Sequence, residues 1–267
     1  MLRSGTIALL FLSSIAPAGQ LPRCPPTYKQ PLVVNADWLV AHRDYVIGLP
    51  SGGRGTPGPP APGAIHDNGC TGLVVFQASG KPVAAAREVV DLEKAGWRGR
   101  VSLLDGGLTA WRAARSAIAA AVAGNDGHST PAPRGYDVRG IVGLEYVRAH
   151  LGALHTSLVD ARTHDLFTGA ALEGPERRGH IPGAVNIPYT DVLASDGALL
   201  AKEELREVFA RAGVPAGNLV IVYCHSGNKA ALVYLAARWA GINAELYEGS
   251  WVERSRETEL PAEIGDR

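Results

Sequence analysis

The sequence has few cysteines and no net charge, and each of these absences excludes a class of protein. Cys 3 in 267 residues is too few for a disulfide scaffold and too few for a zinc site of four thiolates. Lys+Arg 26 balances Asp+Glu 26, so the chain lacks the basic excess of a dedicated nucleic-acid-binding protein. The eight histidines show no metal-ligand spacing. We therefore expect no metal site and no nucleic-acid partner.

Long apolar runs are also scarce, and the most prominent one lies at the start. Thr6–Ile15 follows the basic start Met1–Arg3, is apolar apart from two serines, and ends before Ala16-Pro17-Ala18. This layout predicts a signal peptide over 1–18 and an exported, periplasmic protein. The alternatives are a membrane anchor or an ordinary first helix. The run falls well short of the roughly 20 residues that span a bilayer, and no later run is longer, so we expect no membrane span after cleavage.

Apolar residues make up 46% of the chain, which is enough for a buried core, and three landmarks occur twice in the same order. These are a Pro-Gly-Ala tripeptide followed by Ile or Val, an apolar run that ends at Ser-Gly, and a second short run that ends at a glycine turn. The pairs are Pro62–Ile65 with Pro182–Val185, Leu73–Gly80 with Val220–Gly227, and Leu103–Gly107 with Leu246–Ser250. The repetition predicts two halves built on one plan.

Each half has the pattern of a βαβ unit. Short apolar runs rich in β-branched residues predict buried parallel strands, and each is followed by a turn, a helix and another strand. We expect an α/β fold in which each half is a parallel sheet with helices on both faces. The predicted strands are Leu73–Phe76, Val101–Leu104, Ser157–Asp160, Leu219–Tyr223 and Ala244–Tyr247, and the helices Pro82–Ala95, Glu203–Ala212 and Ala230–Trp239.

Gly 32 and Pro 18 exceed the usual share and imply long irregular connections. Gly48–Gly63 is rich in Gly, Pro and Ser and predicts a surface loop. The segment 123–135 has the composition of an interdomain linker. We therefore expect a first domain over 27–122 and a second over 136–262.

The most reactive side chain of the second half is Cys224, which ends a predicted strand and opens the turn Cys224–Lys229. Main-chain N–H groups of such a turn point at the sulfur and favour an anion, so we expect them to lower the thiol pKa. Gly227 permits close approach of the backbone, and Lys229 or protonated His225 adds positive charge. The alternative is a small buried structural cysteine.

Several motifs together resemble the tandem-domain rhodanese family, which includes thiosulfate and 3-mercaptopyruvate sulfurtransferases. The second half carries Asp160-Ala161-Arg162, Gly179–Pro188, the six-residue loop from Cys224, and Tyr247–Glu253. In the first half Asn35–Leu39 and Gly106–Trp111 resemble the opening and closing motifs of the family. Gln77 stands where the active cysteine of the family lies, which implies that the first half is catalytically silent and covers one side of the active-site cleft.

The resemblance implies a two-step transfer of a sulfane sulfur, with Cys224 as the catalytic residue that carries a persulfide. The donor and acceptor are small molecules, the acceptor being cyanide or a thiol, and a thiol protein is an open alternative. No cofactor is implied. The anion-binding loop comprises His225, Ser226, Gly227, Asn228 and Lys229.

Thiosulfate is the predicted donor, with 3-mercaptopyruvate as the alternative. At the position where mercaptopyruvate enzymes carry a carboxylate-binding arginine this chain has Leu166. The candidate substrate-binding residues are Arg162, Arg177, Arg178 and Trp251. A persulfide carrier and a non-catalytic binding module also stay open. A rhodanese-like phosphatase is disfavoured, because Ala230 occupies the position of the phosphate-binding arginine.

Two further features have structural interpretations. His180 precedes Ile-Pro-Gly, and we expect it to form hydrogen bonds within a turn rather than to act as a catalytic base. Cys24 and Cys70 are the two cysteines available for a disulfide after export, and their pairing stays open.

Overall fold

A computed structural model describes residues 30–42, 46–51, 72–77, 81–97, 100–107, 109–110, 112 and 140–266. The predicted signal peptide 1–18, the predicted linker 123–135, Cys24, Cys70 and the Pro62–Ile65 landmark lie outside these residues. Within them, no helix combines the length and the apolar character that crossing a bilayer requires.

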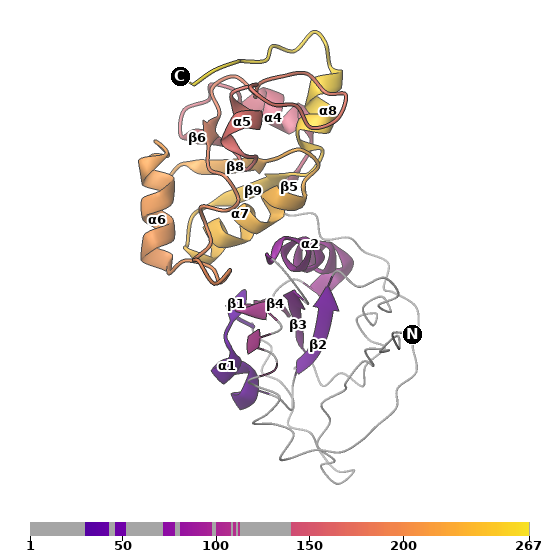
Figure 1. Ribbon diagram of the computed structural model, residues 1–267, viewed down its shortest axis with the longest axis vertical. Coiled ribbons are helices and arrows are strands. Elements are labelled where there is room, and N and C mark those ends of the chain that lie inside the picture. Colours follow the sequence, from indigo (N-terminus) through magenta and orange to yellow (C-terminus); the bar gives the residue numbers. More distant parts are fainter. Residues whose placement is uncertain are drawn as a thin grey trace, which may run out of the picture. The chain divides into compact units, whose positions relative to one another are not determined.

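The described strands form two parallel sheets with the same strand order (Figure 1). The first sheet runs β1-β4-β3-β2, with bounds β1 Val33–Val34, β2 Val46–Ser51, β3 Gly72–Gln77 and β4 Val101–Leu104. The second runs β5-β9-β8-β6-β7, with bounds β5 Ile141–Val142, β6 Thr156–Asp160, β7 Val185–Asn186, β8 Leu219–Tyr223 and β9 Ala244–Tyr247. β1, β4, β3 and β2 thus correspond to β5, β9, β8 and β6. The predicted parallel α/β architecture and the internal repetition are confirmed.

The helices connect the strands as βαβ crossovers require. The helices that follow strands of the first sheet are α1 Ala36–Ala41 and α2 Val83–Leu92, and a π-helical turn Glu93–Trp97 follows α2. Those of the second sheet are α4 Leu144–His150, α5 His164–Phe167, α6 Lys202–Arg211, α7 Asn228–Trp239 and α8 Ser250–Arg256. The chain forms two compact units: the first comprises Met1–Ser79 and Leu92–Tyr136, and the second comprises Gly80–Asp91, which holds most of α2, and Asp137–Arg267.

One predicted loop is partly a strand. We expected an irregular connection over Gly48–Gly63, but Gly48–Ser51 continues β2 and pairs with β3 in parallel register. Pro50 makes this segment resemble a loop, because proline cannot donate a hydrogen bond to a neighbouring strand. β2 lies at the edge of its sheet, where a missing N–H is tolerated. The remainder of the predicted loop lies outside the described residues.

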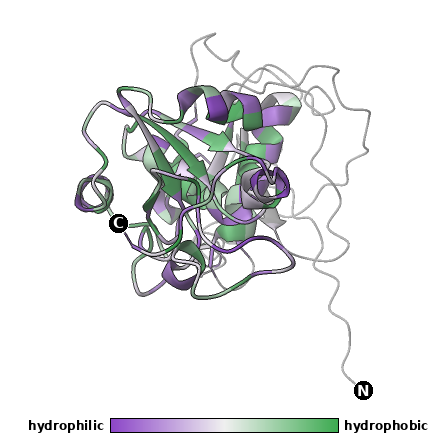
Figure 2. Cartoon of the chain, turned by 90° about the horizontal axis from the view of Figure 1, so that it is seen from above, coloured by the Kyte–Doolittle hydropathy of each residue, from purple (hydrophilic) through white to green (hydrophobic). Residues whose placement is uncertain are grey.

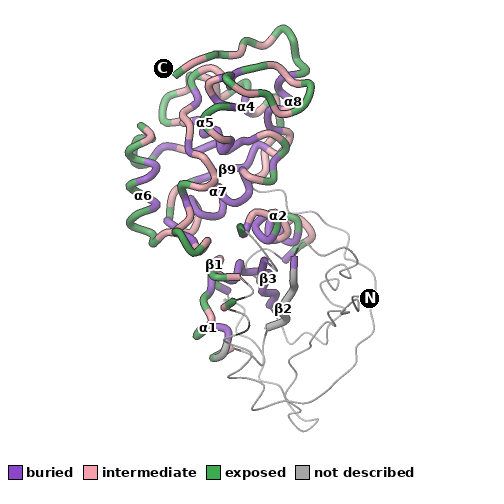
Figure 3. The backbone as a smooth tube through the Cα atoms, in the orientation of Figure 1, coloured by how far each residue is buried: buried purple, intermediate pink, exposed green. Residues whose placement is uncertain are grey.

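The second sheet is covered by helices on both faces. Leu158, Ile221, Tyr223 and Tyr247 pack against apolar side chains of α4, α5 and α8. Successive strand residues point to opposite faces, so the intervening residues of β8 and β9 face α7, which lies against both strands. Eight consecutive residues of α7, Ala230–Ala237, are buried (Figure 3).

The first sheet has a smaller core of the same kind. Leu39 of α1 packs with Val34, Val74, Phe76 and Leu104. α1 begins at Asn35, whose side-chain oxygen accepts a hydrogen bond from Trp38 N at 2.9 Å and caps the helix. Figure 2 shows hydrophobic residues concentrated in the strands, as expected for sheets that are covered by helices.

Gly179, which opens the Gly-His-Ile-Pro-Gly motif, lies where two backbone segments touch. Its φ is +93°, and a Cβ added there would lie 1.9 Å from the carbonyl oxygen of Glu263. His180 and Glu263 form a bridge in which each N–H donates to the other carbonyl, at 2.9 and 3.0 Å. Only glycine fits this close approach, which fastens the C-terminal segment to the second unit.

We expect Gly179→Ala to destabilise the second unit by roughly 3 kcal/mol, because it adds a backbone clash to the cost of a left-handed residue. Gly152→Ala is the matched control, since Gly152 has φ +70° and open space around its Cβ position; it should cost about 1 kcal/mol. Urea unfolding followed by circular dichroism measures both. Equal losses for the two variants would contradict the close approach at Gly179.

Candidate active site

The predicted loop joins β8 to α7, at the carboxyl end of a central parallel strand. Cys224 follows β8 directly, and Gly227 precedes α7 with φ +84°. A Cβ at Gly227 would lie 2.8 Å from the carbonyl oxygen of Glu248. The loop therefore needs glycine here both for its left-handed backbone and for its close packing against the residues that follow β9.

The start of α8 fixes the peptide groups of the loop. Trp251 N donates to Cys224 O at 3.0 Å, and Val252 N donates to His225 O at 2.9 Å. The Ser250 hydroxyl accepts a hydrogen bond from Cys224 N at 3.2 Å and donates one to Tyr247 O at 2.9 Å. Two carbonyl groups of the loop are thus engaged by α8.

The Cys224 sulfur is buried, with 1% of the residue exposed. Burial raises the pKa of the thiol, and the negative charge of Asp160 acts in the same direction. The N–H groups of Ala230, Ser226 and Gly227 lower the pKa, as predicted, but burial outweighs them and the net shift is upward. The expected low thiol pKa is therefore wrong, because the loop amides act in a dehydrated site.

Arg162 and Trp251 form part of the core beneath the loop. The Arg162 guanidinium pairs with the Asp160 carboxylate through Nε at 3.0 Å, and its Nη2 donates to Gly179 O at 2.7 Å. It also lies over the Trp251 ring, 4.8 Å from the centroid. Arg162 is 2% exposed and Trp251 1%. These contacts match a structural ion pair rather than the predicted role of Arg162 in substrate binding.

Arg177 and Arg178 are likewise engaged by main-chain carbonyl groups. Arg177 donates to Ser255 O at 3.1 Å and to Leu260 O at 2.9 Å. Arg178 donates to Gly169 O at 2.7 Å and to Ala170 O at 3.0 Å. These contacts fasten the segment before Gly179 and do not match the predicted role of either arginine in substrate binding. Leu166, at the position where mercaptopyruvate enzymes carry a carboxylate-binding arginine, is buried.

The remaining loop residues divide into an exposed and a paired set. Ser226 and Asn228 are exposed, so the loop reaches solvent although the sulfur is buried. His225 Nε2 lies 3.9 Å from Glu176 Oε2, and Lys229 Nζ lies 3.2 Å from Glu173 Oε2. The two positive groups predicted to meet an anionic donor are thus each next to a carboxylate.

Glu173 and Glu176 are not among the predicted site residues. The available signal was two glutamates flanking a Gly-Pro turn shortly before the Gly179–Pro188 motif. Glu173 and Lys229 are 56 residues apart in the sequence, and such a separation does not indicate that the two side chains are in contact. Only the docking of this turn beside the loop brings them together.

His180 has the hydrogen-bonding role that we expected. Its Nδ1 lies 2.8 Å from Phe167 O, and its ring stacks on the Phe167 ring with centroids 3.7 Å apart. The residue is 1% exposed and takes part in the bridge to Glu263. It therefore orders the turn that contains the Gly-His-Ile-Pro-Gly motif.

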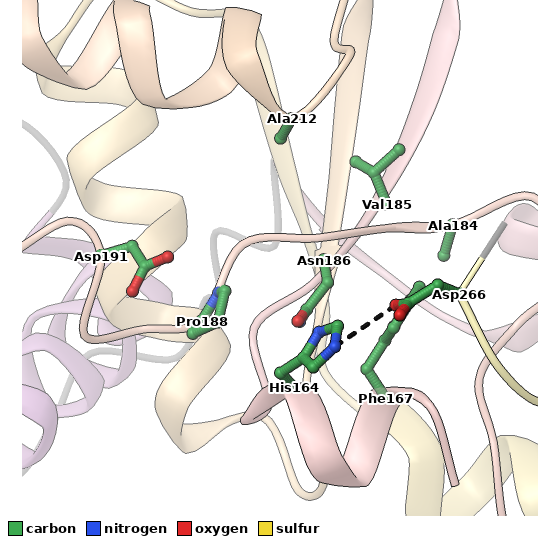
Figure 4. A pocket seen from close by; sticks show the side chains of 9 residues that line it. All are labelled: His164, Phe167, Ala184, Val185, Asn186, Pro188, Asp191, Ala212 and Asp266. Carbon is green, nitrogen blue, oxygen red and sulfur yellow. Dashed lines mark ion pairs between the residues drawn. The ribbon is translucent and has the colours of Figure 1, made fainter.

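A pocket of about 490 Å³ lies in the second unit and is separate from the loop (Figure 4). His164, Phe167, Asn186 and Asp266 contribute to its lining, and His164 Nε2 lies 3.3 Å from Asp266 Oδ1. No residue of Cys224–Lys229 lines it. Among the residues that the structure describes, no group of three or more His, Cys, Asp or Glu side chains is arranged to hold a metal ion.

Comparison with solved structures shows the same fold elsewhere. A structure of EanB with a cysteine persulfide and ergothioneine superimposes with a TM-score of 0.62 and 19% identity. The superposition covers 74% of this chain and 52% of that one.

Comparison of sequences gives nearer relatives. Human 3-mercaptopyruvate sulfurtransferase is 33% identical over 72% of this chain and 65% of its own length. In Pseudomonas aeruginosa, the "Probable 3-mercaptopyruvate sulfurtransferase" is 36% identical over 72% of this chain and 68% of its length. The thiosulfate sulfurtransferase of the same organism is 29% identical over 77% of this chain and 79% of its length. The chain spans 65% of the length of the human relative and 58% of the "Putative thiosulfate sulfurtransferase SseB" of Mycobacterium tuberculosis, to which it is 37% identical over 62% of its own length.

The family model for a rhodanese-like domain matches residues 144–257, which run from α4 to just past α8 and include the Cys224 loop. The strand order, the loop at the end of β8 and the similarity to both kinds of sulfurtransferase lead to one conclusion: this chain belongs to the rhodanese family.

Proposed function

We propose that this protein is a sulfurtransferase that carries a sulfane sulfur as a persulfide on Cys224. The observation that carries the proposal is the set of main-chain N–H groups, from Ser226, Gly227 and Ala230, that act on a sulfur at the end of β8. Such groups stabilise negative charge without a metal ion. The exposed Ser226 and Asn228 place this sulfur next to solvent-accessible loop residues.

In the first step, the Cys224 thiolate attacks the sulfane sulfur of the donor. With thiosulfate, the sulfur–sulfur bond of the donor breaks, its electron pair leaves with sulfite, and a persulfide remains on Cys224. In the second step, a nucleophile attacks the outer sulfur and the electron pair of the broken bond returns to Cys224. Because burial favours the neutral thiol, loss of its proton precedes the first step.

Thiosulfate is the proposed donor, and 3-mercaptopyruvate is the alternative. Members of the family that use mercaptopyruvate carry a carboxylate-binding arginine where this chain has the buried Leu166. The guanidinium groups of Arg162, Arg177 and Arg178 donate to other groups of the protein and do not replace it. The relatives include enzymes of both names. The acceptor is cyanide or a thiol.

We propose that the first unit is not catalytic. Gln77 ends β3 and aligns with Cys224, which follows β8 in the equivalent position of the second sheet. An amide side chain cannot form a persulfide. The proposed location is the periplasm, on the basis of the signal peptide predicted over 1–18.

Cys224→Ser should abolish thiocyanate formation from thiosulfate and cyanide, because serine cannot hold the transferred sulfur. Cys70→Ser is the matched control and should retain the activity. A colorimetric thiocyanate assay measures both. Undiminished turnover in Cys224→Ser would end the proposal. Stable addition of one sulfur atom to the wild-type chain without thiocyanate, seen by intact-protein mass spectrometry, would instead identify a persulfide carrier.

The same assay, with mercaptopyruvate in place of thiosulfate, tests the donor. We expect kcat/KM to be higher for thiosulfate, because Leu166 stands where mercaptopyruvate enzymes of the family carry the arginine that binds the carboxylate of the donor. A higher kcat/KM for mercaptopyruvate would make the alternative the correct assignment.

Alkylation of Cys224 by iodoacetamide should still accelerate as the pH rises past about 8.5, the ordinary value of a cysteine thiol. The sign follows from burial, which raises the pKa and thereby keeps the unreactive protonated form at neutral pH. A variant with Cys24 and Cys70 replaced by serine restricts the reaction to Cys224. A rate that already levels off below pH 7 would contradict the net upward shift.

A further inference from the structure

Two carboxylates stand beside the His225 and Lys229 side chains of the Cys224 loop. Glu176 Oε2 lies 3.9 Å from His225 Nε2, and Glu173 contacts Lys229 Nζ through both oxygens, at 3.4 and 3.2 Å. The Glu176 side chain is 9% exposed and that of His225 18%, whereas Glu173 and Lys229 are more open. The charge of Lys229 therefore already faces a carboxylate before any substrate arrives, as does the His225 ring.

The backbone around these carboxylates is fixed independently of the ion pairs. Trp251 Nε1 donates to Arg177 O at 2.9 Å. The Arg177 side chain donates to Ser255 O, and the Arg178 side chain donates to Gly169 O. Gly174 turns the segment back on itself, so that a Cβ there would lie 2.4 Å from Glu176 Oε2. Glu176 is thus held in place beside the loop.

The Glu176–His225 pair contains two polar atoms that form no hydrogen bond. Glu176 Oε2 and His225 Nδ1 are both buried and have no hydrogen-bond partner. A buried carboxylate oxygen without a donor is costly, and a bound molecule with an N–H group would relieve that cost. Other charged side chains nearby are engaged elsewhere. Arg162 pairs with Asp160, Arg177 and Arg178 bind carbonyl groups, and Arg87, whose Nη1 would lie 3.2 Å from a Cβ added at Gly227, pairs with Asp91 and Glu248.

We propose that Glu173 and Glu176 make the persulfide site select sulfur acceptors that carry a protonated amine over acceptors that carry an anion. Glu176 accepts a hydrogen bond from the ammonium group, and Glu173 offsets the charge of Lys229, which would otherwise favour an anion. The substrate class is a small aminothiol. This inference rests on the proposed function of Cys224 and adds the charge preference of its second step.

The chemistry of that step is a simple exchange. The aminothiol sulfur, as thiolate, attacks the outer sulfur of the Cys224 persulfide. The bond between the two persulfide sulfurs breaks, its electron pair stays on the Cys224 sulfur, and the aminothiol leaves as a persulfide. The ammonium group keeps its proton and serves only to position the acceptor.

Three acceptors of similar size test the proposal: cysteamine, 2-mercaptoethanol and 3-mercaptopropionate, which carry an ammonium group, no charge and a carboxylate. The full chain is first loaded with excess thiosulfate or inorganic polysulfide. Loss of the sulfur from Cys224 after mixing with each acceptor is then followed by intact-protein mass spectrometry. The quantity of interest is the ratio of the rate constants for cysteamine and 3-mercaptopropionate, compared between variants so that differences in acceptor reactivity cancel.

We expect this ratio to fall roughly three- to tenfold in Glu176→Gln and in Glu173→Gln, and further in the double variant, since each removes one negative charge near the acceptor. Glutamine keeps the size of the side chain, which limits effects on folding. Glu207→Gln is the matched control, because Glu207 is exposed on α6 beside Arg211 and loses the same charge; its ratio should equal that of the wild type.

A ratio in Glu176→Gln and Glu173→Gln that matches the wild type would overturn the inference while leaving the persulfide chemistry intact. An equal fall in Glu207→Gln would also overturn it, because the effect would then come from net charge. Absence of any added sulfur on Cys224 after both donors would be the failure of the proposed function itself, and the inference would fall with it.

Discussion

The candidate site depends on two hydrogen bonds from α8, Trp251 N to Cys224 O and Val252 N to His225 O. They engage the carbonyl groups at the start of the loop, and Ser250 engages the N–H of Cys224 through its hydroxyl. With these groups satisfied, the following N–H groups are free to act on the sulfur. The conformation of the loop therefore depends on α8, which is separated by two residues from β9, the strand next to β8.

The packing that fixes the Cys224 loop also excludes water from the sulfur. Asp160 and Arg162 form an ion pair in the core, the Trp251 ring lies against the guanidinium, and the sulfur is left 1% exposed. Loop amides alone would favour a thiolate, but burial and the Asp160 charge favour the thiol. In the proposed persulfide transfer this balance matters, because the amides then have most effect on charge that develops as the sulfur moves.

Much of the fold could be predicted from the sequence. Val101–Leu104, Leu219–Tyr223 and Ala244–Tyr247 are strands with the predicted bounds, because short β-branched runs between glycine turns have few other stable arrangements. β2 was missed because Pro50 and its glycine-rich surroundings are typical of loops, and the edge position that tolerates proline is a property of the whole sheet.

The sequence by itself determined the parallel α/β plan, its repetition, and the position of Cys224 between a strand and a helix, since these depend on neighbouring residues. The tertiary structure decided the charge and hydration of the site. Glu173 and Glu176 meet Lys229 and His225 across some 50 residues of chain, and burial reverses the expected shift of the thiol pKa. Electrostatic energies depend on distance in space and on the exclusion of water, and neither quantity is written in local sequence.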